Sequence, residues 1–125
     1  MKSNLVRDKS YAFAPRTIGL ARWLKQQKEF EIAGHILRSG TAVGSNVEET
    51  LAGISRPDFI AKMSVASKEA RETHYWLRLL RDSKIVDNSR ILPLETENLE
   101  LIKILTAIVK TSQTGTVNSK SKIQN

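Results

Sequence analysis

The chain has 125 residues, 40% of them hydrophobic, and it contains no cysteine. A domain of this size buries enough apolar surface to fold without cross-links, and the missing thiols exclude disulfides, thiolate metal sites and cysteine nucleophiles. Twenty lysines and arginines against 13 acidic residues give a formal charge of +7, which favours polyanionic partners.

The first predicted helix covers residues 9–27, because apolar residues recur there every three or four positions. Pro15 limits where this helix can begin. Its apolar residues form two neighbouring stripes, which are Tyr11, Ala14, Ile18 and Ala21, and Phe13, Thr17, Leu20 and Leu24.

The second predicted helix covers residues 31–54 and carries an unbroken heptad seam. Ser55, Pro57 and Asp58 then form a capping-box-like start of a third helix, which is predicted to end near Ser83. The seam of the second helix is Phe30, Ala33, Leu37, Gly40, Gly44, Val47, Leu51 and Ile54, and that of the third is Phe59, Met63, Ala66, Ala70, Thr73, Leu77 and Leu80.

The fourth helix follows a predicted loop at residues 87–89, with Pro93 near its start. The apolar residues of this helix are Leu94, Leu101, Ile102, Leu105, Ile108 and Val109. From residue 114 the chain becomes polar and aperiodic, which predicts a disordered tail. The chain therefore divides into an N-terminal arm (1–8), a helical bundle (9–113) and a polar tail (114–125). It has neither a membrane-length apolar run nor a signal-peptide pattern, so we expect a cytoplasmic protein without a membrane partner.

The short connections make successive helices antiparallel neighbours, so the predicted fold is all-α, an up-down-up-down antiparallel four-helix bundle. With the turn centred near Ser55, Gly40 is expected opposite Ala70 and Gly44 opposite Ala66. Small residues would then allow the second and third helices to approach closely. A local kink at either glycine is the alternative.

The first, third and fourth helices each carry a second set of apolar residues, beyond the one stripe that a bundle needs. Exposed apolar patches of this kind mark interfaces, so we expect a symmetric homo-oligomer. A single wide core that absorbs both stripes is the alternative. The second set is Leu20, Leu24, Val65, Trp76, Leu79, Ile102 and Val109.

The sequence contains no convincing catalytic, cofactor or metal site. His35 and His74 are expected near each other, but neither follows a glutamate by the three positions that a di-iron bundle uses, which leaves ordinary histidines or a surface metal site. Ser39, His35 and Glu49 form a nucleophilic triad only on paper, because nothing supplies an oxyanion hole. We therefore predict a non-enzyme that uses no cofactor.

Positive charge is concentrated at the start of the chain, where residues 1–28 hold seven bases and one acid. A tryptophan between cations suits base stacking beside phosphate neutralisation. An interface tryptophan, and basic helices that pair with acidic ones, are the alternatives. The candidate nucleic-acid-binding residues are Lys9, Arg16, Arg22, Trp23 and Lys25.

Three segments, 37–49, 55–62 and 68–80, together resemble the four helix bundle proteins, also called 23S rRNA-intervening sequence proteins. The resemblance covers about residues 9–111. We interpret the matching positions as structural or subunit-contact residues, although the polar side of the second helix is equally typical of a solvated face. The matching residues are Arg38, Ser39, Gly40, Thr41, Gly44, Asn46, Glu49, Lys68, Glu69, Glu72 and Thr73.

This resemblance implies a bacterial cytoplasmic bundle that assembles as a ring-like homopentamer. The related accessory variability proteins of diversity-generating retroelements engage a reverse transcriptase and nucleic acid, whereas most stand-alone members have no established activity. The expected function is therefore a non-catalytic homo-oligomer that binds RNA or DNA through a basic surface. The alternative is a protein-interaction scaffold without a nucleic-acid role, whose partner is encoded nearby.

Overall fold

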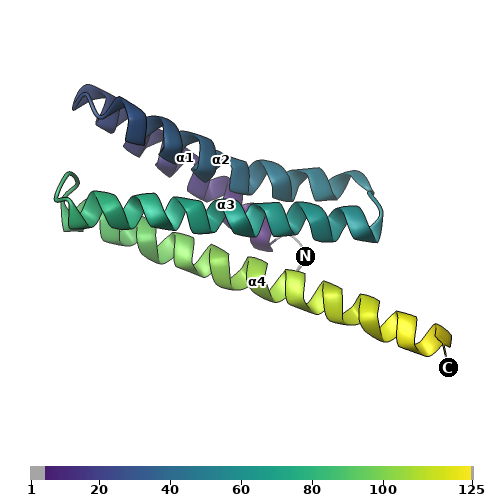
Figure 1. Ribbon diagram of the computed structural model, residues 1–125. Helices are drawn as coiled ribbons and strands as arrows, with labels where there is room; N and C mark the ends of the chain where they lie inside the picture. Colours follow the sequence, from purple (N-terminus) through teal and green to yellow (C-terminus); the bar gives the residue numbers. More distant parts are fainter. Residues whose placement is uncertain (1–4, 125) are drawn as a thin grey trace.

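The computed structural model describes the backbone of residues 5–124 and the side chains of residues 5–114, and this part of the chain contains helices and no strand. Neighbouring helices run antiparallel, as predicted, with two of the interhelical turns at one end of the bundle (Figure 1). No described helix is long and apolar enough to cross a membrane. The elements are α1 (Leu5–Gln26), α2 (Phe30–Glu49), the 3-10 helix η2 (Thr50–Ala52), α3 (Arg56–Asp82) and α4 (Asn88–Gln124).

The start of α3 confirms the N-cap of the predicted capping-box-like start. The Ser55 hydroxyl accepts a hydrogen bond from the Asp58 backbone N–H at 3.3 Å, and Pro57 lies in the first turn. The predicted end of the second helix is wrong by five residues, because the α-helix stops at Glu49 and a 3-10 turn follows. Gly53 then reverses the chain with φ of +72°, a conformation that favours glycine.

Two of the three prolines predicted near helix starts, Pro15 and Pro93, lie inside helices. Helix α1 begins at Leu5, so Pro15 lies in its interior, where the missing N–H leaves one backbone hydrogen bond unmade. The start of α4 is fixed by Asp87, whose carboxylate accepts the Ser89 backbone N–H at 3.1 Å, and Pro93 follows inside the helix. Residues 1–4 of the predicted arm lie outside the described residues.

Helix α4 continues to Gln124 and projects beyond the other three helices (Figure 1). The sequence led us to expect an irregular polar tail from residue 114. The segment contains no proline and a single glycine, Gly115, so nothing in it interrupts the helical hydrogen-bonding pattern. The helical backbone therefore differs from the predicted tail.

All four helices contribute to the core, which includes the predicted α3 seam and one of the two α1 stripes. Every α3 seam residue is buried except Phe59, which is half-buried. In α1 the stripe that includes Leu20 and Leu24 is buried, whereas Tyr11 of the other stripe is 70% exposed. Leu20 and Leu24 are therefore core residues, and their assignment to surplus surface is wrong. Of the second apolar set, Val65 stays 41% exposed.

Gly40 and Gly44 of α2 face α1 and not α3, so the expected pairing with Ala66 and Ala70 is wrong. A Cβ atom at Gly40 would lie 2.6 Å from Cγ2 of Thr17, and one at Gly44 would lie 3.3 Å from the Ser10 carbonyl oxygen. Small residues in α2 thus allow close approach to α1. The register between α2 and α3 nevertheless lies close to the predicted one, because Ser39 meets Thr73.

Candidate functional site

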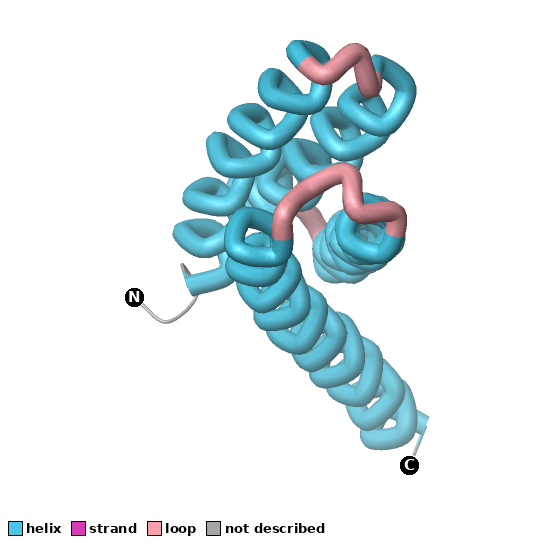
Figure 2. The backbone as a smooth tube through the Cα atoms, turned by 90° about the vertical axis from the view of Figure 1, so that its left-hand side faces the viewer, coloured by secondary structure: helices cyan, strands magenta, loops and turns pink. Residues whose placement is uncertain are grey.

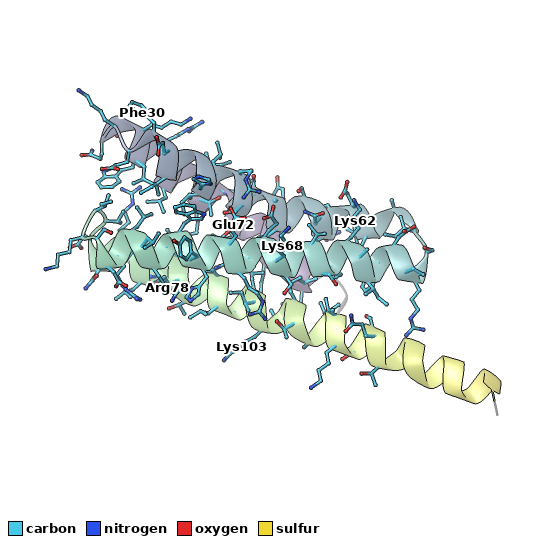
Figure 3. The ribbon with its side chains drawn as sticks, viewed as in Figure 1. Phe30, Lys62, Lys68, Glu72, Arg78 and Lys103 are labelled. Atoms are coloured by element: carbon cyan, nitrogen blue, oxygen red, sulfur yellow. The ribbon has the colours of Figure 1, made fainter. Side chains whose placement is uncertain are left out.

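A polar network joins α2 to α3 on the face that carries the family-like residues. The Arg38 guanidinium donates to Glu69 at 2.9 Å and also to Glu72. Glu72 accepts a further hydrogen bond from Nε1 of Trp76 at 3.4 Å. The Arg38 hydrogen bond lowers the pKa of Glu72 from its ordinary value despite partial burial. Figure 3 shows Glu72 on α3 at the edge that faces α2.

His35 extends this network by stacking on Trp76, with ring centroids 4.2 Å apart. The predicted approach of His35 to His74 is therefore replaced by a contact with tryptophan. Nδ1 of His74 is buried without a hydrogen-bond partner among the described residues, and burial, followed by the Arg78 charge, lowers the pKa of His74. Within the described residues, no three histidine or acidic side chains gather closely enough to hold a metal ion.

Buried hydroxyl groups continue the α2–α3 contact beneath the Arg38 network. Oγ1 of Thr73 lies 2.9 Å from Oγ of Ser39, and the Ser39 hydroxyl donates to the His35 carbonyl at 2.8 Å. Near the turn, Lys62 pairs with Glu49 at 3.0 Å. These residues, most of them family-like, thus connect two helices of the same chain. The contacts of Trp76 and Lys62 with α2 were not predicted from the sequence, although the register between α2 and α3 indicates them.

The remaining family-like positions make local contacts. The Asn46 side chain donates to the Ala42 carbonyl at 2.8 Å, and the Thr41 hydroxyl donates to the Leu37 carbonyl at 2.6 Å. Lys68 is exposed on α3 (Figure 3). The hydrogen bonds of Asn46 and Thr41 lie within α2, so neither side chain connects α2 to a neighbouring helix.

The candidate nucleic-acid-binding residues of α1 divide into two groups. Lys9 pairs with Glu100 at 2.5 Å and Arg16 with Glu97 at 2.7 Å, so both cations are neutralised by α4. Trp23 is half-buried against the core. The Arg90 guanidinium lies 5.2 Å from the Trp23 ring centroid, a cation–π contact that joins α4 to α1.

Arg22 and Lys25 form the second group, because both are exposed and make no ion pair within the described residues. They lie at the end of the bundle that holds the α1–α2 and α3–α4 turns, which faces the viewer in Figure 2. We call this the basic end, and its carboxylates are those of Glu29, Glu31, Asp82 and Asp87. The cations that define the basic end are Arg22, Lys25, Lys28, Lys84 and Arg90.

An apolar groove of about 460 Å³ lies at the opposite end of the bundle, beside the α2–α3 turn. Leu5 and Leu51 are exposed at its rim, with 52% and 47% of their surface accessible. A groove of this composition seats apolar side chains or ligands rather than charged ones. Its lining residues are Leu5, Val6, Val47, Thr50, Leu51, Phe59, Met63, Ile104 and Ile108.

Comparison with known proteins identifies relatives of this bundle. The model of a family described as 23S rRNA-intervening sequence protein matches residues 2–107. Among solved structures, the chain is similar to a protein with unknown function from the S23 ribosomal protein family of Bacteroides thetaiotaomicron. That protein is 42% identical, the match covers 88% of this chain and 99% of the other, and the TM-score is 0.83. No curated protein matches the chain.

Proposed function

We propose that this chain, which belongs to the 23S rRNA-intervening sequence protein family, is a non-catalytic homo-oligomer that binds RNA or DNA through a basic surface. The observation that carries the proposal is the basic end, where exposed cations stand without carboxylate partners in the described residues. Lys9 and Arg16 differ in this respect, because Glu100 and Glu97 already neutralise them.

An exposed aromatic ring supports the same surface. Phe30 begins α2 at the basic end, and 61% of its surface is exposed (Figure 3). Stacking of a base on an aromatic ring contributes about 1–3 kcal/mol per base and tolerates any sequence. Trp23, the residue predicted from the sequence to stack on a base, is half-buried beneath Arg90. Phe30 is more exposed and is therefore the better candidate for base stacking.

A fluorescence anisotropy titration with labelled single-stranded RNA, single-stranded DNA and duplex DNA tests the proposal. We expect binding that weakens by orders of magnitude between about 50 and 200 mM salt, because cations that contact phosphates release counterions. The double substitution Arg22→Gln and Lys25→Gln is expected to weaken binding of all sequences alike.

The matched control removes the same charge from the same helix, by Lys9→Gln and Arg16→Gln. Because α4 already neutralises these two cations, the control is expected to change the affinity less than the Arg22 and Lys25 pair does. Equal losses in the two variants would show that net charge, and not the basic end, determines binding. Absence of binding by the unaltered protein at about 50 mM salt would contradict the proposal.

A protein-interaction scaffold is the second candidate function, and the apolar groove beside the α2–α3 turn favours it. A groove with exposed leucines at its rim is typical of a protein contact. Recovery of one stoichiometric protein partner after nuclease treatment, together with loss of that partner in Leu51→Lys, would favour the scaffold. Loss of all partners on nuclease treatment would favour the nucleic-acid function.

A further inference from the structure

We infer that the groove between α3 and α4 binds the backbone phosphates of a nucleic acid, an inference that rests on the proposed function and assigns it a second surface. A groove of about 240 Å³ lies between these helices, and six of its seven lining residues are polar or charged. Arg71 and Lys110 supply two positive charges to it, and no carboxylate lines it. Its lining residues are Ser64, Ser67, Arg71, Thr106, Val109, Lys110 and Gln113.

The side chain of Arg71 is held in place for an anionic ligand. Nη2 of Arg71 donates to the Thr106 hydroxyl at 2.8 Å, which ties the guanidinium to α4 across the groove. A guanidinium carries five N–H donors, so this bond leaves others for a phosphate oxygen. The hydroxyls of Ser64 and Ser67, which also line the groove, are further donors that suit phosphate oxygens.

Further cations extend this positive surface along the bundle. Arg78 follows Arg71 by seven residues on α3, and Lys103 precedes Lys110 by seven on α4, so each pair is separated by about 10.5 Å along its helix. All four side chains are exposed. Figure 3 shows Arg78 at the α4 side of α3, and Lys103 projecting from α4.

The glutamates of α3 and α4 leave this surface positive because each is engaged elsewhere. Glu69 and Glu72 bind Arg38 of α2. The three glutamates of α4 also have partners, since Glu97 and Glu100 pair with α1, and Glu95 receives two hydrogen bonds from Arg81 at 2.9 Å. None of these carboxylates is among the residues that line the groove. Within the groove, a phosphodiester backbone therefore meets cations without a competing anion.

Anisotropy titrations with labelled single-stranded RNA and DNA over about 50–200 mM salt test this inference on the double variant Arg71→Gln and Lys110→Gln. Loss of two phosphate contacts is expected to reduce the slope of log affinity against log salt by about 1.4, at about 0.7 per contact. Affinity at about 100 mM salt is expected to fall roughly tenfold.

The matched control, Arg7→Gln with Lys62→Gln, removes two charges that pair with Asp8 and Glu49 outside the groove. It is expected to retain the slope. Equal slopes in the groove variant and the unaltered protein would overturn the inference and leave the proposed function standing. An unaltered protein that binds neither nucleic acid would overturn both. Light scattering is also measured on each variant. If the groove variant loses binding and its oligomer also dissociates, the groove is a subunit contact and not a phosphate site.

Discussion

At the scale of single residues, Gly40 shows how the absence of a side chain positions α2 against α1. An added Cβ would lie 2.6 Å from the Thr17 side chain, which is fully buried and branched at Cβ and so has little room to move. We expect Gly40→Ala to lower the free energy of unfolding by about 1–3 kcal/mol, as overpacked cores do. Urea unfolding followed by circular dichroism measures this change.

Two other helical glycines are matched controls for this substitution. Apart from the adjacent backbone of the same helix, no heavy atom lies within 4 Å of a Cβ added at Gly19 or Gly34. Gly19→Ala and Gly34→Ala are therefore expected to stabilise the protein by about 0.5–1 kcal/mol each, through helix propensity alone. A Gly40→Ala protein as stable as these two would show that α1 and α2 do not depend on the close approach.

At the scale of helices, the Arg38 network connects α2 to α3 and makes that connection sensitive to acid. The pKa of Glu72 is lowered from its ordinary value of 4.5, first by the Arg38 hydrogen bond. A carboxyl group whose pKa is lower in the folded protein stabilises it above the unfolded pKa, and this contribution disappears as pH falls through the folded value. Acidification below about pH 4.5 is therefore expected to weaken the α2–α3 contact.

The variant Arg38→Gln tests this expectation through melting temperatures measured between about pH 3 and pH 7. We expect it to melt below the unaltered protein at neutral pH, with a difference that narrows on acidification, because protonated Glu72 no longer pairs with Arg38. Arg7→Gln is the control, since its pair with Asp8 is exposed and joins no helices. A constant difference at all pH values would assign the Arg38 effect to packing instead.

The existence and order of the helices could be predicted from the sequence because each helix buries a periodic stripe. The α3 seam and the Ser55 cap depend only on local spacing, and both are confirmed. It was harder to predict which neighbouring helix each face packs against. Gly40 was assigned to the wrong neighbour because periodicity places a residue on a helix face without showing which of two adjacent helices that face meets.

For charged residues too, the sequence does not show which neighbouring helix a side chain meets. Net charge along the chain identified α1 as basic, but Lys9 and Arg16 are paired with glutamates some 80 to 90 residues away in sequence. The groove cations Arg71 and Lys110 belong to helices with mixed charge, so counting charges by segment gave no sign of them. Only the fold shows that the neighbouring glutamates are turned toward other helices.

At the scale of the whole molecule, the α3 face around Val65 keeps exposed apolar surface after the core is complete, and we expect a subunit contact there. Val65 is 41% exposed, and Trp76 lies three turns further along α3 on the same side, partly buried. An oligomer would cover Val65 and the accessible part of Trp76, in accord with the usual role of exposed apolar surface. Light scattering is therefore expected to give a mass that is a multiple of 14.0 kDa.

Val65→Lys tests whether this face makes the subunit contact, because a buried lysine without a partner opposes association. We expect the scattering mass of the variant to fall toward 14.0 kDa at micromolar concentration, with helical circular dichroism unchanged since Val65 lies outside the core. The control is Tyr11→Lys, which replaces an aromatic residue that is 70% exposed on α1. A Val65→Lys protein that keeps the mass of the unaltered oligomer would place the contact on another face, and a mass of 14.0 kDa for the unaltered chain would exclude the oligomer.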